Sequence, residues 1–331
     1  MKKSIYIFSE GELKRKQNTL YFQGPEGKRK YVPVENTGEI YIFGEVSINK
    51  KLLELLSKSQ IILHFFNYYG YYVGSYYPRE YYNSGFMILK QSEFYLDLAK
   101  RLDIAKRFVA GAAANMKKVL TYYNNRGSRL QEYLDAIESN EATINERNSN
   151  AQLMAIEGNI REAYYKAFDE IVKRDDFSFG KRTKRPPENR INALISFGNS
   201  IIYTIVLSEI YKTHLDPRIG FLHATNFRRF TLNLDVAEIF KPIIVDRVIF
   251  YLLNKGMIKA SSFRNDLNGI FMKDTVRKTF IEELEKRLGT TIEHRELGKR
   301  VSYRHLIRLE LYKLEKHLME EKAYQPFVAR W

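Results

Sequence analysis

The pattern of hydrophobic and polar positions changes near residue 84 of this 331-residue chain. Before that point, short segments alternate apolar and polar residues and are rich in β-branched and aromatic side chains, which is typical of strands. Turn-forming clusters such as Gly24-Pro-Glu-Gly27 and Asn36-Thr-Gly38 separate these segments. The pattern predicts strands at residues 4–8, 19–22, 30–34, 39–43 and 61–66, and a helix at residues 49–59.

Beyond residue 88 the apolar residues recur at i, i+3, i+4 and i+7, which is the period of an amphipathic helix. We therefore expect an α+β fold, with a small N-terminal β-domain over residues 1–84 and a larger all-α domain over residues 85–331. The helical segments are predicted near residues 92–123, 128–174, 189–213, 234–255, 274–289 and 302–323.

A tyrosine-rich stretch, Asn67 to Tyr77, follows the predicted strand at residues 61–66 and carries Gly70 and Gly74 as turn signals. Its aromatic faces could stack on nucleic-acid bases of any sequence. Tyrosine is also common in strands and at protein interfaces, so a strand pair or a dimer surface is the favoured explanation of the stretch. The residues leave these alternatives open.

The chain is strongly basic, with a formal charge of +15 and a pI near 9.6. Such a charge indicates a polyanionic partner, either nucleic acid or an anionic membrane surface. No apolar run reaches the about 20 residues that span a bilayer. The longest candidate, residues 239–253, is interrupted by Lys241, Pro242, Asp246 and Arg247. With no signal-peptide pattern at the start, we expect a cytoplasmic protein without a membrane partner.

Cysteine is absent from the sequence, which excludes disulfides, thiolate zinc sites and cysteine nucleophiles. Chemistry must then come from other side chains, and Glu157 is the first candidate. It lies four residues after Leu153 and three before Ile160, so we expect it on the buried side of its helix. A carboxylate there needs a bound cation or an ion pair. Arg161, one turn later, is the obvious partner for an ion pair.

A second candidate stretch runs from Gly220 to Pro242 and contains His223, Asp235 and Glu238. The two carboxylates are three residues apart on one helix face, in an apolar setting. Pro242 predicts a kink or the start of a new helical segment. The alternatives are a capping or surface pair for the carboxylates and a structural role for the histidine.

Glu157 together with this stretch would supply two carboxylates and one imidazole. That set suits Mg²⁺ or Mn²⁺, whereas zinc is less expected without cysteine or a second nearby histidine.

Clustered basic residues surround these candidates and would bind DNA phosphates. A solvated charged loop is the alternative for any such run. The candidate DNA-binding residues are Arg161, Lys181, Arg182, Lys184, Arg185, Arg190, Arg228 and Arg229.

Taken together, these segments resemble the CRISPR-associated adaptation integrase family, and the style of the sequence is similar to its type I-B branch. The resemblance extends over essentially the whole chain, including the N-terminal stretches 43–49 and 66–79. It rests on Glu157-Gly158, Arg185-Pro-Pro, Asn192-Ala-Leu-Ile-Ser-Phe-Gly198, Gly220-Phe-Leu-His223 and Leu234-Asp-Val-Ala-Glu-Ile-Phe-Lys-Pro242.

The resemblance implies that Glu157, His223 and Glu238 bind the metal ion and that Asp235 is a supporting acidic residue. It also implies a homodimer joined through the β-domains and a small second CRISPR adaptation protein as partner. The implied substrate is double-stranded DNA: the 3′-hydroxyl of a prespacer attacks a phosphodiester of the repeat. The resemblance thus predicts a DNA endonuclease and integrase that depends on Mg²⁺ or Mn²⁺.

Three other functions compete with this prediction. The first is a general metal-dependent DNA nuclease, and the second is a non-catalytic DNA-binding scaffold with a degenerate site. The third, a cationic membrane-surface protein, requires a basic amphipathic helix, and the sequence shows no such segment.

Overall fold

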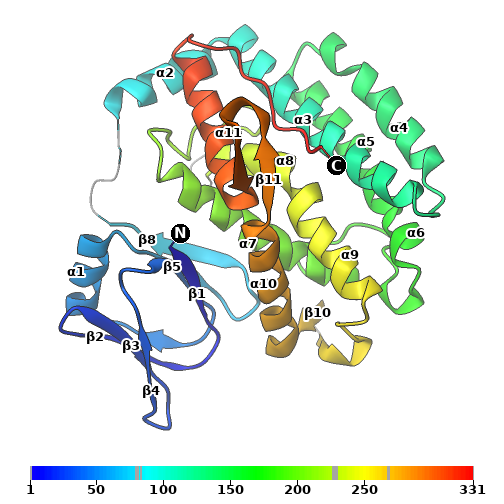
Figure 1. Ribbon diagram of the computed structural model, residues 1–331. Helices are drawn as coiled ribbons and strands as arrows, with labels where there is room; N and C mark the ends of the chain where they lie inside the picture. Colours follow the sequence, from blue (N-terminus) through cyan, green and yellow to red (C-terminus); the bar gives the residue numbers. More distant parts are fainter. Residues whose placement is uncertain (1, 79–81, 83, 226–229, 267–268, 331) are drawn as a thin grey trace. The chain divides into compact units, whose positions relative to one another are not determined.

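The computed structural model describes residues 2–78, 82, 84–225, 230–266 and 269–330. The chain divides into two compact units, Met1–Tyr81 and Tyr82–Trp331, which are described separately (Figure 1). The division lies three residues before the expected boundary. The first unit is built from strands and the second mostly from helices, so the predicted α+β class is confirmed.

The N-terminal unit contains two four-stranded sheets and one helix (Figure 1). In the order β1-β5-β7-β8, the first two pairings are parallel and the last is antiparallel. In the order β4-β3-β2-β6, only the short β2–β6 pairing is parallel. The elements are β1 (Lys3–Ile7), β2 (Gly11–Lys16), β3 (Thr19–Gln23), β4 (Arg29–Val32), β5 (Thr37–Ile42), β6 (Val46–Ser47), α1 (Lys50–Ser59), β7 (Ile62–Phe66) and β8 (Tyr72–Tyr76).

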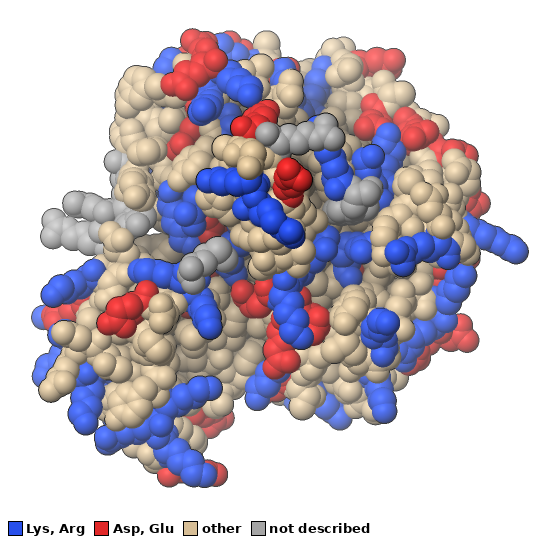
Figure 2. Space-filling model, in the orientation of Figure 1, with Lys and Arg blue, Asp and Glu red and all other residues tan. Residues whose placement is uncertain are grey.

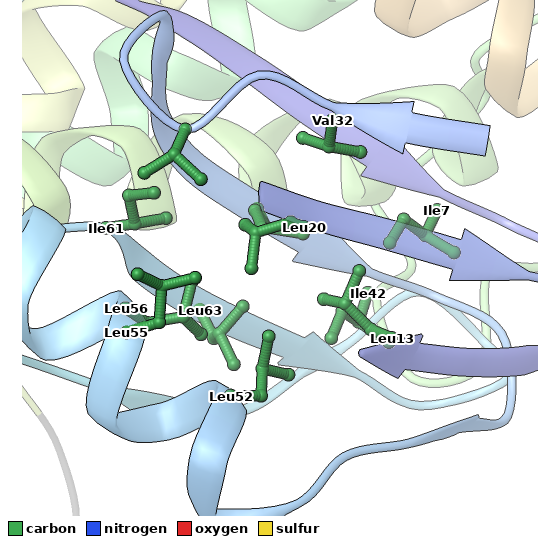
Figure 3. Close-up of a cluster of buried hydrophobic side chains, with 12 residues drawn as sticks. Ile7, Leu13, Leu20, Val32, Ile42, Leu52, Leu55, Leu56, Ile61 and Leu63 are labelled. Atoms are coloured by element: carbon green, nitrogen blue, oxygen red, sulfur yellow. The ribbon is translucent and has the colours of Figure 1, made fainter. Parts of the chain in front are cut away.

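One hydrophobic cluster joins both sheets to α1 (Figure 3). Leu13 and Leu20 come from one sheet, Ile42 and Leu63 from the other, and Leu52 from the helix. All five are nearly or fully buried, and each strand contributes alternate residues, as period-2 side-chain placement requires. This cluster explains why the first unit forms its own core.

The helical unit places its helices close to the predicted segments, although the segment predicted at 92–123 is divided between α2 and α3. The segment predicted at 128–174 is divided into α4, α5 and α6, and two short antiparallel hairpins, β9–β10 and β11–β12, make the unit mostly rather than entirely helical. The elements are α2 (Gly85–Leu96), α3 (Leu98–Asn124), α4 (Gln131–Ala142), α5 (Asn150–Lys166), α6 (Phe168–Val172), α7 (Arg190–Ile210), α8 (Leu232–Lys241), α9 (Arg247–Asn254), β9 (Phe263–Asp266), β10 (Gly269–Met272), α10 (Asp274–Gly289), β11 (Thr291–His294), β12 (Lys299–Ser302) and α11 (Tyr303–Leu318).

A π turn over Pro242–Asp246 joins α8 directly to α9. Pro242 has no N–H to donate to the carbonyl of Glu238, so a regular α-helix loses a hydrogen bond at this point. The π turn accommodates the proline by inserting one extra residue into the helical path. The structure thus shows a local change of helical register at the position where the sequence predicts a kink.

Helix α7 is long and apolar enough to cross a membrane, by length and composition alone. It is the single such candidate within the described ranges, and residues 239–253 do not qualify. However, 83% of its most apolar window is buried inside the chain. Its apolar character is therefore that of a core helix, against which α8 packs.

The C-terminal segment runs across the helical unit (Figure 1, red) and contacts α8. The amide of Asn115 donates to the carbonyl oxygens of Ile239 at 3.0 Å and Phe327 at 2.9 Å, and its oxygen accepts from Ala329 N at 2.8 Å. The Phe327 ring stacks on Phe240, with centroids 5.9 Å apart. Since Phe240 lies in α8, these contacts hold in place the helix that carries Asp235 and Glu238.

Candidate active site

Helix α5 places Glu157 in a largely covered position, with 16% of its side chain exposed. Ser149 begins this helix, and its hydroxyl accepts the backbone N–H of Gln152. One turn after Glu157, the Arg161 guanidinium donates to Glu157 Oε1, with an Nε–Oε1 distance of 2.7 Å. The same guanidinium contacts Glu238 Oε2 on α8. Arg161 therefore bridges the two glutamates, and the ion pair considered from the sequence is present.

Glu238 is 5% exposed and is surrounded by donors. Its Oε1 lies 2.5 Å from Lys241 Nζ and accepts from the Tyr203 hydroxyl at 3.4 Å. Burial opposes its ionisation, but the positive charges of Arg161 and Lys241 outweigh this effect and lower the pKa of Glu238 to about 2. Burial also lowers the pKa of Lys241, to about 8, even though Glu238 favours its charged form.

Asp235 organises the loop that carries His223. It is fully buried, and its Oδ2 accepts the backbone N–H groups of Phe221 at 2.6 Å and Leu222 at 3.0 Å. Its Oδ1 accepts the backbone N–H of His223 at 3.1 Å and lies 2.6 Å from His223 Nδ1. All these bonds point inward from one carboxylate, so a surface or simple capping role for Asp235 does not describe the structure.

Asp235 thereby holds the imidazole of His223 through Nδ1, which leaves Nε2 as the nitrogen that could bind a metal ion. Burial acts to lower the pKa of His223, but the hydrogen bond to Asp235 and the charges of Asp235, Glu238 and Glu157 raise it overall. The influence of both glutamates on this ring shows that α5, α8 and the loop before α8 bring these groups into one neighbourhood.

The residues that could hold a metal ion are Glu157, His223 and Glu238. Their donor set, two carboxylates and one imidazole nitrogen, fits Mg²⁺ or Mn²⁺. As placed, no three His, Asp or Glu side chains of the described residues are arranged closely enough to hold an ion. Arg161 and Lys241 contact the glutamate oxygens that an ion would use, so metal binding requires these cations to give way.

Lysine and arginine side chains are spread over the face drawn in Figure 2. The candidate DNA-binding residues fall into three groups. Lys181, Lys184 and Arg185 are exposed. Arg182 instead donates to Asn192 at 2.9 Å and Ser196 at 3.1 Å. Arg190 donates to the Asp176 carbonyl and Arg161 to the glutamates, whereas Arg228 and Arg229 lie outside the described residues.

Two residues of the site, Tyr203 and Lys241, were missed as candidates from the sequence. The Lys241 ammonium contacts the Tyr203 hydroxyl and lies 4.4 Å from the centre of its ring. A lysine within the apolar run Ile239-Phe-Lys-Pro-Ile-Ile-Val245 was an available signal, because a buried ammonium requires a partner. Nothing in the local pattern around Tyr203 distinguishes it from the apolar residues of α7.

The loop before α8 has further support that the sequence did not reveal. Asn150, at the start of α5, donates to the carbonyl oxygens of Phe221 at 2.5 Å and Leu222 at 3.1 Å. Arg101 of α3 donates to the same Phe221 carbonyl at 3.0 Å. Both contacts join residues distant in sequence, so no short motif contains them.

Gly220→Ala should destabilise this loop. A Cβ at Gly220 would lie 2.8 Å from Asp235 Oδ2 and 2.9 Å from the Thr231 side chain, both of which are buried. The backbone must then move away from the carboxylate that holds it, at an expected cost of about 1–3 kcal/mol. Urea denaturation measures this cost. Gly158→Ala is the matched control, because a Cβ there meets open space, and an equal loss in both variants would contradict the prediction.

Comparison with known proteins places this geometry in a family. A family model described as CRISPR associated protein Cas1 matches residues 5–286. A CRISPR-associated endonuclease Cas1 of Thermodesulfovibrio yellowstonii is 62% identical over 331 residues, covering all of both chains. A solved Cas1 protein from Thermotoga maritima has a TM-score of 0.87 at 48% identity, covering 98% of this chain and 99% of that one.

Two more distant structures share the fold alone. A casposase bound to its integration product has a TM-score of 0.87 at 20% identity, covering 99% of this chain and 93% of the other. A chain of a Cas6-RT-Cas1–Cas2 complex has a TM-score of 0.85 at 16% identity, covering all of this chain and 36% of the other. The subtype I-B assignment stays a prediction. The family model and the high identity over the full length show that this chain belongs to the Cas1 family of CRISPR-associated proteins.

Proposed function

We propose that this chain is a metal-dependent DNA endonuclease and integrase of CRISPR adaptation. The observation that carries the proposal is the Arg161 bridge between Glu157 of α5 and Glu238 of α8, with His223 near enough for both glutamates to raise its pKa. Relatives that cover 97–100% of this chain are named CRISPR-associated endonucleases, and the casposase with the same fold was solved with an integration product. The proposed reaction inserts spacer DNA into the repeat array by attack of a 3′-hydroxyl on a phosphodiester.

Glu157, His223 and Glu238 would hold Mg²⁺ or Mn²⁺, which when bound orients the hydroxyl and the phosphate and offsets charge on the phosphoryl oxygens. His223 Nδ1 lies 2.6 Å from Asp235 Oδ1, so the carboxylate would accept the Nδ1–H and leave the Nε2 lone pair for the ion. Arg161 and Lys241 keep positive charge beside the glutamates. These residues orient the ligands and supply a cationic setting for a DNA phosphate.

The proposed partners are prespacer and repeat DNA, a second copy of this chain, and a small second adaptation protein. Neighbours in Cas1–Cas2 complexes support the last of these. We propose that the second copy joins through the N-terminal unit, which exposes Tyr68, Tyr69 and Val73 around its β7–β8 turn. The cytoplasm is the proposed compartment, and no membrane partner is proposed.

A strand-transfer assay tests this function. It combines fluorescent short duplexes, a repeat-bearing plasmid, Mg²⁺ or Mn²⁺, and the candidate small partner. We expect joined products in the presence of metal and none with EDTA. Cleavage without joining would favour a general nuclease, and DNA binding without either reaction would favour a non-catalytic scaffold.

The exposed cluster before α7 should contribute to DNA affinity. Replacing Lys181, Lys184 and Arg185 by alanine removes three positive charges and leaves buried packing intact. If each contacts one phosphate, the slope of log K against log salt becomes shallower by about 2.7, at about 0.9 per phosphate. Fluorescence anisotropy over a salt series measures the slope. A variant with alanine at Lys28, Lys51 and Lys58 is the charge-matched control, and an unchanged slope in the first variant would contradict the prediction.

A further inference from the structure

Asp246 is a buried carboxylate that the proposed reaction does not use. It is 1% exposed, and its Oδ1 is buried without a hydrogen-bond partner among the described residues. Burial raises its pKa to about 7, although the charges of Lys241 and Arg161 favour ionisation. A buried acid with an unused oxygen costs free energy of folding. A role in the neighbouring candidate active site would explain why a carboxylate is present at position 246.

The π turn directs Asp246 toward the site. In a regular α-helix, residue 246 would be rotated about 80° from Glu238, since eight residues turn the chain by about 800°. The extra residue of the π turn reduces this to about 700°, which is nearly two full turns. Asp246 therefore lies on the same face of the joined α8–α9 helix as Glu238.

Lys241 occupies the position between these two carboxylates. It lies three residues after Glu238, a spacing that shares a face in an α-helix, and five before Asp246, a spacing that shares a face in a π turn. Its ammonium now contacts Glu238 and Tyr203. Among the positive charges near Asp246, that of Lys241 has the largest effect on its ionisation, followed by that of Arg161.

Two tyrosines of α5 lie near enough to Asp246 for its charge to act on them. Tyr164 and Tyr165 lie seven and eight residues after Glu157, two turns further along the same helix, and Asp246 is the largest electrostatic influence on both. Asp246 is thus near both the α5 tyrosines that follow Glu157 and the Lys241 ammonium that contacts Glu238.

The charges of the site favour an anionic acceptor for Lys241 once a metal ion is bound. The two glutamates are balanced by Arg161 and Lys241 as the chain stands. A divalent ion held by the same glutamates would add two positive charges and compete with both basic side chains. We propose that Asp246 is a positioning residue that accepts the Lys241 ammonium when a divalent ion takes Glu238. This inference rests on the metal site proposed above.

Metal affinity of the full-length chain tests the inference without any DNA substrate. In Asp246→Asn the displaced lysine has no anionic acceptor, so we expect Mn²⁺ to bind about 10-fold more weakly, as for other residues that support metal ligands. In the Lys241→Met background there is no ammonium to displace, so adding Asp246→Asn should change the affinity by less than about twofold. Electron paramagnetic resonance titration of free Mn²⁺ measures both effects.

Stability and a matched control separate this role from a structural one. In EDTA, Asp246→Asn should melt at the wild-type temperature or higher, because the substitution removes a buried, incompletely bonded charge. Glu209→Gln should leave Mn²⁺ affinity unchanged, since Glu209 is equally buried but pairs with Lys212 and Arg308. Unchanged Mn²⁺ affinity in Asp246→Asn would overturn this inference but not the proposed metal site. An equal drop in affinity in the wild-type and Lys241→Met backgrounds would do the same. Equal Mn²⁺ binding by wild type and Glu238→Ala overturns the proposed metal site as well.

Discussion

Replacing Glu238 by alanine should reduce metal-dependent strand transfer by roughly 10²-fold or more. Loss of a residue that merely supports a ligand costs about 10- to 100-fold, and Glu238 is proposed as a ligand itself. The substitution also leaves Arg161 and Lys241 without their shared carboxylate. Removing one partner of a buried ion pair destabilises a protein by about 3–5 kcal/mol. Activity must therefore be measured alongside the folded fraction, by circular dichroism under the assay conditions.

Two further variants separate loss of chemistry from loss of folding. Glu238→Gln keeps the size of the side chain and one accepting oxygen, although its NH₂ would face either Arg161 or Lys241. It should therefore fold better than the alanine variant, which keeps neither, and still be inactive. Glu238→Asp keeps the carboxylate and should recover part of the activity. Full strand transfer by folded Glu238→Gln protein would exclude a metal-ligand role for this residue.

The fold class could be predicted because strand-like alternation and helical periodicity occupy long, separate parts of the sequence. The sequence did not predict β2, where Leu13 is the single buried residue among charged neighbours. The hairpins β9–β10 and β11–β12 were also missed, since four-residue strands give too few alternations to distinguish them from loops. Short strands depend on pairing partners, which a local pattern does not contain.

The candidate site shows the same division between local and long-range information. Asp235 and Glu238 share a helix face by spacing alone, so their neighbourhood is predictable from sequence. Arg161 was proposed both as a partner of Glu157 and as a DNA-binding residue. Its bond to Glu157 follows from i,i+4 spacing, whereas its contact with Glu238 spans 77 residues and required the fold. The position of Asp246 depends on the π turn, which no spacing rule for a regular helix includes.

Replacing Asp235 by asparagine should destabilise the chain by about 2–4 kcal/mol. Both carboxylate oxygens accept N–H groups of residues 221–223, and the amide NH₂ of asparagine would face such a donor in either orientation. Each buried N–H left without an acceptor costs about 1–3 kcal/mol. Urea denaturation in EDTA measures the loss without any contribution from bound metal.

The same substitution should alter His223 even where the protein remains folded. Without the Asp235 carboxylate, Nδ1 loses its acceptor and the proton is free to move to Nε2, the nitrogen proposed to face the metal ion. Nitrogen-15 NMR of the imidazole should show a shift in tautomer, together with weaker Mn²⁺ binding. Asp97→Asn is the matched control, because Asp97 accepts two backbone N–H groups at an exposed helix start, where asparagine caps equally well. If Asp235→Asn matched that control in both stability and tautomer, Asp235 would not be the residue that orients His223.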